Sequence, residues 1–454
     1  MKTKHKIIVL GALIVIFCSC AVVLVILLHV IFGFGVKTQA PSSSQDMAQV
    51  SKETMSAEIT IHSAVGLEEE SQDTLYTQIP SSPLPQSKAY NAMPMQQGKD
   101  SLKQEALISL YEKIEEKVYY ISEQKNEEGF FPMERITVRN AQLTDVQVVQ
   151  ALSAFLHDHP EVFWVSNQYG YSTTESKTTV QLYSVIAPGE CMKISKRLSS
   201  EIQSTLQSVP EGTSALDREI YLYDTLIQKC DYDKEAAQDD ANWRAHSIVG
   251  VFLDGQAVCE GYARAFQLLL NQSGIPSMLV TGTAEGAHMW NLVRIDGQWY
   301  HADPTWDDNG EYAVHQYLNL SDSMIQQDHT LYPTVQNAQK VEANKLYNLP
   351  LPSCTAVKAN YFRSKAVPLD NDAKALTQAL KKAAQKREKR ISIYVGEDTD
   401  YQQAVTRLFL ESPYQFLYSV RQANLEAEHP IHYDGCSYVE ADISRGIVVL
   451  LDYE

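Results

Sequence analysis

The sequence has few cysteines and no arrangement of them that would hold a metal ion. Seven cysteines occur among 454 residues, without a CxxC pair or a paired His/Cys cluster, so the ligand spacing of zinc sites is absent. Aspartates gather in residues 230–243 and 307–311, but neither segment has the regular ligand spacing of a calcium loop. We therefore expect no metal and no other cofactor.

Sustained runs of positive charge are also absent after the first few residues. The chain has 38 Lys and Arg against 56 Asp and Glu, a net charge of −18. Proteins that bind nucleic acid present a basic surface to the phosphates. The composition therefore argues against nucleic acid as a partner.

The number of cysteines after residue 36 is odd. They are Cys191, Cys230, Cys259, Cys354 and Cys436. At least one thiol must stay unpaired within the chain, which fits a reactive cysteine. The irregular spacing is not a disulfide framework, and it leaves open whether the other four cysteines pair.

One long apolar run occupies residues 7–34, with Ser19 and His29 among its few polar members. A run of this length can span a bilayer as a helix. Lysines at positions 2, 4 and 6 precede it, so the positive-inside rule places residues 1–6 in the cytoplasm and the rest outside. A cleaved signal peptide is the alternative, which the length of the run disfavours. The sequence predicts a single-pass membrane anchor.

Composition and periodicity divide the remaining chain. Residues 35–100 are rich in Ser, Gln, Pro and Glu and predict a disordered linker. The predicted domains that follow are an N-terminal α/β module over 101–188, a catalytic core over 189–345 and a C-terminal α/β module over 346–454. The overall class is therefore α+β.

The two outer modules share a predicted order of helix, strand, helix, strand, strand. Ala151, Pro160 and Phe163 align with Ala404, Pro413 and Phe416, and the intervals are nine and three residues in both. This alignment predicts a strand over 416–420, and another strand is expected over 446–451. The pattern indicates a duplicated module, with chance similarity as the alternative. We expect such modules to shape the cleft or bind a partner.

Cys259 stands at the start of a predicted helix. Asp254-Gly255 indicates a turn before it, apolar residues recur at helical spacing over 262–270, and the Gly at 274 ends the run. The first turn of a helix favours an anion and so lowers the pKa of a thiol. The backbone N–H of Cys259 is then free to stabilise an oxyanion. A buried structural cysteine is the alternative.

A histidine and an aspartate follow on two predicted strands. Residues 288–295 alternate as a strand, Asp296-Gly297 is a two-residue hairpin turn, and residues 298–303 pair back antiparallel. In this register Asp303 lies about one residue pair from His288 on the same face. A carboxylate placed there would hold the imidazole in one tautomer, as in catalytic triads.

Three segments resemble the core motifs of the transglutaminase-like cysteine enzyme superfamily, in its bacterial secreted or membrane-tethered branch. They are AVCEGYA at 257–263, HMWN at 288–291 and DPTWD at 303–307. The resemblance extends over about residues 217–323. It implies a papain-like fold, with the cysteine at a helix N-terminus and the histidine and aspartate on neighbouring strands.

The resemblance also implies chemistry. Cys259 would be the nucleophile, His288 the general base and acid, and Asp303 the orienting carboxylate. An acyl group would pass through a thioester to water, as in a peptidase or amidase, or to an amine, as in cross-linking.

The family often draws its second oxyanion donor from an aromatic or polar side chain. Four residues are candidates for this donor or for the cleft wall: Trp243, His246, Gln256 and Trp290. Trp290 is expected first as a wall, because it lies next to the base. Gly261 and Tyr262 complete the predicted cleft residues, since a glycine would allow a substrate backbone to come close.

These features predict a membrane-anchored, extracytoplasmic thiol enzyme that acts on peptide or glutaminyl amide bonds. Its location makes cell-wall peptide or surface protein the natural substrate class. The triad does not decide between hydrolysis and cross-linking, because both reactions use it. The alternative is a catalytically silent binding or scaffold protein on the same fold.

Overall fold

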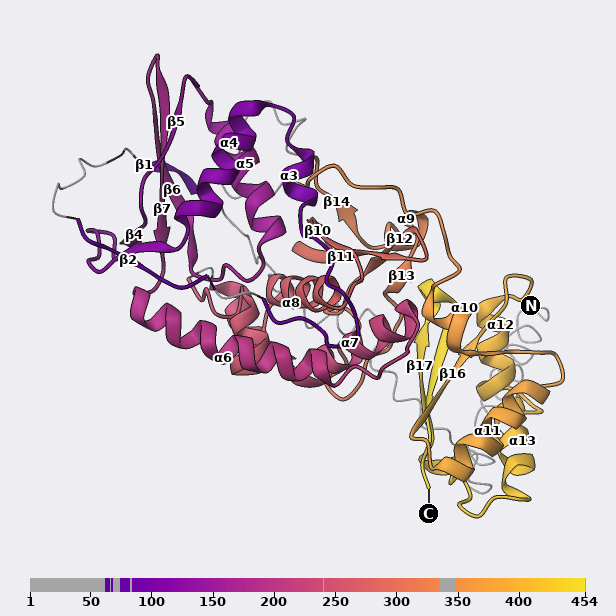
Figure 1. Ribbon diagram of the computed structural model, residues 1–454. Helices are drawn as coiled ribbons and strands as arrows, with labels where there is room; N and C mark the ends of the chain where they lie inside the picture. The colour runs from indigo at the N-terminus through magenta and orange to yellow at the C-terminus, as the bar shows by residue number, and fades with distance from the viewer. Residues whose placement is uncertain are drawn as a thin grey trace, which may run out of the picture. The chain divides into compact units, whose positions relative to one another are not determined.

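The computed structural model describes residues 62–65, 67, 74–81, 84–239, 241–334 and 348–453. They form two compact units, one within residues 44–364 and one over residues 365–454 (Figure 1). The predicted membrane span and cytoplasmic segment lie outside the described residues. Within those described ranges, no helix is both long and apolar enough to cross a membrane.

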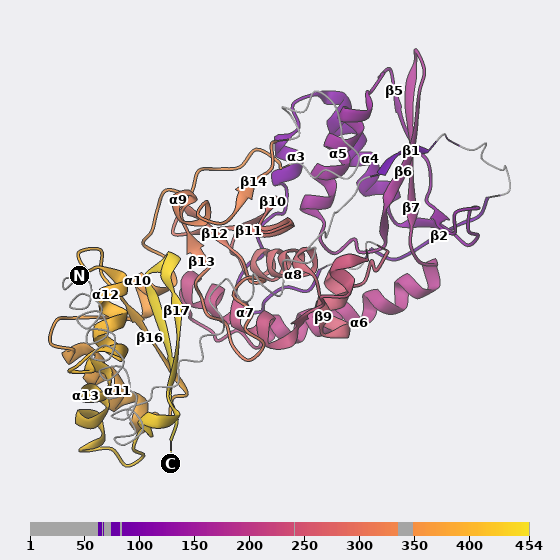
Figure 2. The ribbon, with the colours of Figure 1, turned by 180° about the vertical axis from the view of Figure 1, so that it is seen from behind.

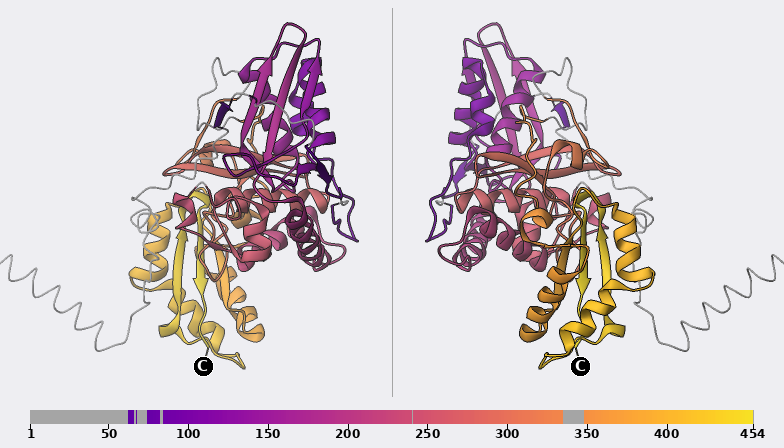
Figure 3. Two further views of the ribbon diagram at one scale, coloured as in Figure 1. Left: turned by 90° about the vertical axis from the view of Figure 1, so that its left-hand side faces the viewer. Right: turned by 90° about the vertical axis from the view of Figure 1, so that its right-hand side faces the viewer.

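The first unit begins with a sheet and two helices. The strands are β1 (His62–Val65), β6 (Val165–Thr173), β7 (Lys177–Ser184) and β4 (Phe131–Pro132), paired in that order, and β5 (Ile136–Arg139), which also pairs with β7. The helices α4 (Glu105–Lys117) and α5 (Asp145–Asp158) lie beside the long β6–β7 hairpin (Figure 3). Thr144 caps α5 in a capping box with Gln147.

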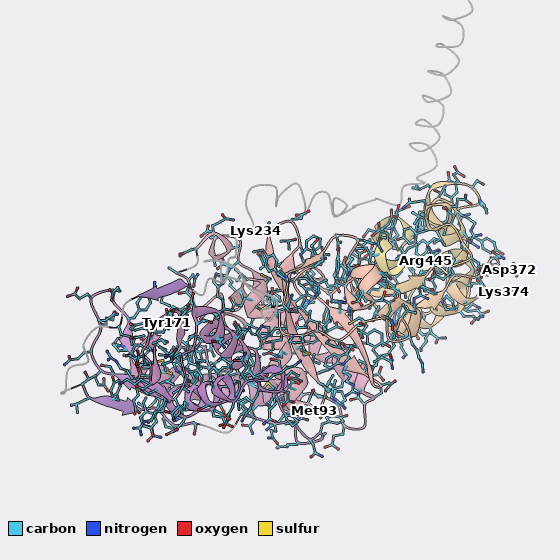
Figure 4. All side chains as sticks on the ribbon, turned by 90° about the horizontal axis from the view of Figure 1, so that it is seen from above. Met93, Tyr171, Lys234, Asp372, Lys374 and Arg445 are labelled. Carbon is cyan, nitrogen blue, oxygen red and sulfur yellow. The ribbon has the colours of Figure 1, made fainter. Side chains whose placement is uncertain are left out.

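The prediction of a disordered linker over 35–100 is wrong for its C-terminal part. The ordered elements there are β2 (Tyr76–Gln78), which pairs with β3 (Tyr120–Ser122), and α3 (Gln97–Ser101). The N–H of Met93, labelled in Figure 4, donates to the carbonyl of Asn271 at 2.7 Å. Composition suggested disorder, but main-chain hydrogen bonds anchor this segment to the folded unit.

The centre of the first unit is an antiparallel sheet packed on a buried helix. Its strands, in order of pairing, are β13 (Leu318–Leu320), β12 (Gln298–Ala302), β11 (Ala287–Ile295), β10 (Ser277–Thr283) and β14 (Thr330–Leu331). The helices are α6 (Pro188–Gln207), α7 (Ala215–Lys229) and α8 (Cys259–Gln272). α8 lies between the sheet and the other two helices (Figure 2).

Short elements connect these larger ones. They are β8 (Asp231–Tyr232), η1 (Ala236–Gln238), η2 (Gly250–Asp254), β9 (Gln256–Ala257), α9 (Asp322–Ile325) and α10 (Tyr361–Lys365).

The predicted hairpin between β11 and β12 is confirmed. Asp296 and Gly297 have φ of 49° and 81°, and positive φ at both turn residues is what a two-residue type I′ connection requires. Ile295 pairs with Gln298, which fixes the register of both strands. The Asn291 side chain on β11 then donates to a carbonyl of α8, that of Ala263, at 2.9 Å. Sheet and helix are thereby held together.

The second unit is a four-stranded sheet with helices on one face (Figure 1). Its strands, in order of pairing, are β15 (Val367–Pro368), β16 (Arg390–Tyr394), β18 (Gly446–Leu450) and β17 (Ser437–Ala441). The helices are α11 (Lys374–Lys386), α12 (Tyr401–Val405), its continuation η4 (Thr406–Leu410), and α13 (Gln415–Asn424). The second unit begins at Lys365 among the described residues, whereas the C-terminal module was predicted to begin at residue 346. The predicted domain limits stay predictions.

The predicted strand over 416–420 is wrong, because these residues belong to α13. Phe416 and Val420 are buried one helical turn apart, and a short apolar run does not distinguish helix from strand. The strand expected over 446–451 is β18. The strand pairings nevertheless correspond, since β7 pairs with both β5 and β6, as β18 does with both β16 and β17. The predicted duplication itself stays a prediction.

Asn348 stabilises the sheet beside β10. Its buried amide accepts a hydrogen bond from the N–H of Thr281 at 2.7 Å. It also donates to the carbonyls of Thr281 and Tyr332, both at 2.8 Å. The side chain therefore pairs with three main-chain groups, one of which, the Thr281 carbonyl, also accepts the N–H of Tyr332 at 2.9 Å.

We expect Asn348→Ala to lower the free energy of unfolding by about 3 kcal/mol, because it leaves buried main-chain groups unpaired. Urea denaturation followed by circular dichroism measures this loss. Gln207→Ala, an exposed amide on α6, is the matched control and should change stability by less than about 0.5 kcal/mol. Equal effects of the two variants would contradict the assignment.

Candidate active site

Cys259 is the first residue of α8, as predicted. The preceding residue, Val258, provides no side-chain cap, so the first-turn N–H groups have no intrahelical acceptor. These groups and the helix dipole favour negative charge on the sulfur. The residue is buried, with 1% of its surface exposed.

His288 lies on β11, and its ring contacts the carboxylate of Asp303. Its Nε2 is 2.6 Å from Asp303 Oδ2, and both side chains are fully buried. Nδ1 has no hydrogen-bond partner among the described residues. Burial by itself lowers the pKa of His288, but Asp303 and then Cys259 outweigh burial and raise it to about 10. The site therefore favours a protonated imidazole beside the sulfur.

Asp303 follows β12 and is fixed through both carboxylate oxygens. Its Oδ1 accepts the backbone N–H groups of Thr305 at 2.9 Å and Trp306 at 3.2 Å. Its Oδ2 lies near two imidazoles, His288 at 2.6 Å and His329 at 3.1 Å. Burial by itself would raise the pKa of Asp303, but the two histidines outweigh it and hold the pKa well below its usual range. The group is thus a carboxylate.

His329 is a residue that the sequence analysis missed. It directly precedes β14 and its side chain is fully buried. Its second ring nitrogen, Nδ1, lies 2.5 Å from Asp328 Oδ1. It follows Asp303 by 26 residues and belongs to none of the recognised motifs, so only the folded chain brings it to the site.

Trp290 packs against His288, and its N–H already has an acceptor. Its ring stacks on His288, with centroids 5.7 Å apart and an interplanar angle of 19°. The indole N–H donates to Nδ1 of His301 at 2.9 Å, and Nε2 of His301 is 2.9 Å from Asp322. The expected role of Trp290 as oxyanion donor does not fit this hydrogen bond, and its role as a cleft wall stays a prediction.

The other three predicted donors have different neighbours. Trp243 stacks on Phe163, with ring centroids 6.1 Å apart. His246 Nδ1 lies 3.3 Å from the carboxylate of Glu260, and Gln256 is exposed. None of these contacts involves the sulfur or the imidazole of the site.

Gly261 and Tyr262 serve the packing of α8. A Cβ at position 261 would lie 2.6 Å from the carbonyl oxygen of Ala245. The expected close approach of a substrate backbone is therefore corrected, because the chain itself occupies this space. The Tyr262 hydroxyl lies 2.7 Å from the carbonyl oxygen of Cys230 and 2.6 Å from Asp308 Oδ2, which fixes the helix to its neighbouring loops.

Tyr232 is a second residue that the sequence analysis missed. It lies on β8 opposite Ala257, two residues before Cys259. Its hydroxyl is buried without a hydrogen-bond partner among the described residues. Burial raises the pKa of Tyr232, and the nearby negative charges of Cys259 and Asp303 raise it further.

The raised pKa of His288 makes the stability of the fold depend on pH. The ordinary pKa is 6.5 and the folded-state pKa about 10, so this stabilisation is complete below pH 6.5 and is lost as the pH rises toward 10. We expect the free energy of unfolding to fall by up to about 4 kcal/mol between pH 6.5 and 9.5. Urea denaturation at a series of pH values measures it. In Asp303→Asn the decline should be much smaller, and an unchanged decline would refute this source.

Comparison with known proteins finds a family match over the site. The transglutaminase-like superfamily matches residues 203–304. This segment includes Cys259, His288 and Asp303 and ends before His329.

Two curated relatives share part of this segment. Kyphoscoliosis peptidase of Mus musculus is 27% identical over 109 residues, which are 21% of this chain and 16% of that protein. Kyphoscoliosis peptidase of Homo sapiens is 26% identical over 109 residues, with the same shares. The chain thus spans only 16% of the length of these relatives.

Two solved structures are also similar. One is described as a TGase, at 16% identity over 47% of this chain and 61% of the other, with a TM-score of 0.26. The other is a putative cysteine protease from Cytophaga hutchinsonii, at 11% identity over 42% of this chain and 72% of the other, with a TM-score of 0.20.

Proposed function

Because the chain carries a domain of the transglutaminase-like superfamily, we propose that it is a thiol acyl-transfer enzyme with Cys259, His288 and Asp303 as its catalytic triad. The observation that carries the proposal is a buried imidazole held by a carboxylate at 2.6 Å, together with a thiol at a helix N-terminus that contributes to the raised pKa of that imidazole. Nucleophilic catalysis by cysteine needs a thiol, a base to activate it and a third group to orient the base.

The proposed reaction has two stages. The Cys259 thiolate attacks the carbonyl carbon of an amide, the C–N bond breaks, and the protonated His288 gives its proton to the leaving amine. The thioester that remains is then attacked by water or by an amine. His288 takes the proton of this second nucleophile, and the thiolate leaves when the C–S bond breaks. Asp303 keeps the ring oriented in both stages.

We propose peptide or glutaminyl amides as substrates. Residues 7–34 would anchor the protein in the cell membrane with its N-terminus in the cytoplasm, and the catalytic part would face outward. This location supports cell-wall peptide or surface protein as substrate. The two outer modules would shape the cleft or bind a partner.

We also propose that Tyr232 donates the second hydrogen bond to the oxyanion, beside the N–H of Cys259. Its buried phenol has no hydrogen-bond partner among the described residues, and its pKa responds to the charge of the sulfur. A buried donor without a partner carries an energetic cost, which a transient oxyanion would relieve.

A catalytically silent scaffold is the second candidate function. The observation that favours it is burial, because the side chains of the proposed triad are closed off from solvent. An enzyme must open this site to admit a carbonyl group, whereas a scaffold need not.

The reactivity of Cys259 decides between the two functions. We expect iodoacetamide to modify Cys259 rapidly well below pH 8 in the full chain, and His288→Ala to abolish this fast reaction, because the imidazolium stabilises the thiolate. Peptide mass mapping identifies the modified residue, and Cys259→Ala is the control. A thiol that reacts no faster than free cysteine would favour the scaffold.

Tyr232→Phe tests the oxyanion donor. We expect acylation of Cys259 by p-nitrophenyl acetate to slow by about 10–100-fold, since this reaction passes through an oxyanion. Alkylation by iodoacetamide forms no oxyanion and should keep its rate. Release of p-nitrophenolate and peptide mass mapping measure the two reactions. Tyr171→Phe on β6, labelled in Figure 4, is the matched control. Equal slowing of both reactions would refute the role.

A further inference from the structure

His329 lies between two carboxylates. Nε2 is 3.1 Å from Asp303 Oδ2, and Nδ1 is 2.5 Å from Asp328 Oδ1. Three aromatic rings enclose the imidazole: Trp306 with its centroid at 5.0 Å, Trp290 at 5.1 Å and Tyr317 at 5.5 Å. The ring is thus fixed in place with both nitrogens on acceptors.

This geometry determines where the protons are. A neutral imidazole carries one N–H and can donate from one nitrogen only, whereas an ionised carboxylate can only accept. Asp303 already accepts two main-chain N–H groups at Oδ1, and Asp328 Oδ2 accepts the Tyr317 hydroxyl at 2.7 Å. Both acids are therefore placed as acceptors, and His329 needs a proton on each nitrogen to satisfy them.

We propose that His329 is a positioning residue of the active site: an imidazolium, held in that form by Asp328, that shares the Asp303 carboxylate with His288. The inference rests on the proposed function, because His329 acts through Asp303 on the imidazole that serves the nucleophile. Charges then alternate along the path from Cys259 through His288, Asp303 and His329 to Asp328.

The charged and titratable groups around His329 are consistent with this role. Asp303 and Asp328 raise the pKa of His329 against the effect of burial, and His288 lowers it. His301 is a further neighbour, whose own pKa is lowered by burial and by the charge of His329.

The side chains around Asp303 are better suited to share protons than to bind a metal ion. His288, Asp303 and His329 offer ligand atoms within 4.8 Å of one another. A metal, however, would need the lone pairs of the same Nε2 atoms that carry the protons donated to Asp303. The hydrogen-bonded arrangement already satisfies the carboxylate.

The positive charge of His329 should lower the proton affinity of its neighbours. Its ring centroid is 5.5 Å from that of His288. Removing a unit charge at this distance from His288 should move the pH profile of Cys259 alkylation upward by about one unit or more. A residue with only a structural role would change the amount of folded protein but not this midpoint.

The first experiment measures the rate of Cys259 alkylation by iodoacetamide against pH in the full chain. His329→Gln keeps an N–H donor but removes the charge, so we expect the midpoint to move upward by about one pH unit or more. Asp328→Asn removes the carboxylate that holds the second proton and should move the midpoint in the same direction by less. The matched controls lie in the second unit: His432→Gln, whose histidine also contacts an aspartate, and Asp372→Asn, exposed and labelled in Figure 4. Both should leave the midpoint unchanged.

The second experiment observes the ring directly. In the ¹⁵N-histidine-labelled wild-type chain, the signals lost in His329→Gln should show both nitrogens protonated at pH 7. If His329→Gln does not fold, Asp328→Asn, with its partly exposed carboxylate replaced, identifies the His329 signals by their change in chemical shift.

The outcomes are separable. A single protonated nitrogen on His329, or an unchanged midpoint in a folded His329→Gln chain, would overturn the inference. Slow alkylation of wild-type Cys259 at all pH values would instead overturn the proposed function, and the nitrogen signals would still decide the state of His329.

Discussion

The arrangement of the site depends on the hydrogen bonds that the carboxylate of Asp303 accepts. Main-chain N–H groups fix one oxygen, and the other faces both His288 and His329. A buried carboxylate without such partners would cost several kcal/mol, or would take up a proton. The two imidazoles make an ionised carboxylate stable in the interior, and the carboxylate in turn orients them. Burial, charge and ring orientation are thus one coupled property of the site.

A few local features of the fold set the positions of this carboxylate, of His288 and of the thiol. A type I′ turn sets the register of β11 and β12, which carries His288 to the level of Asp303. The Asn291 amide joins β11 to α8, and α8 presents Cys259 at its first residue. Each of these connections is short, so each one directly fixes the position of the next element.

These same local features explain how much the sequence could predict. The helix start at Cys259 and the hairpin before Asp303 follow from periodicity and turn chemistry, and the structure confirms both. His329 and Tyr232 could not be found in this way, because long-range packing alone brings them to the site. The prediction of a strand over residues 416–420 failed for a different reason, since a short apolar run fits either a helix or a strand. Residues 76–100 are ordered because they form hydrogen bonds with main-chain groups far away in the sequence. Amino-acid composition cannot predict such bonds.

The alternating charges have a consequence for chemistry inside a closed site. Desolvation strengthens each attraction between neighbours, but it also makes every unpaired charge costly. In the proposed reaction, His288 passes its proton to the leaving amine as the thiolate becomes a neutral thioester, so the two changes of charge cancel. The Asp303, His329 and Asp328 groups keep their charges throughout. The buried network therefore needs no rearrangement between the two stages, and only the nucleophile and its base change state. Such a fixed electrostatic frame is the property by which enzymes stabilise reacting charges without reorganising their surroundings.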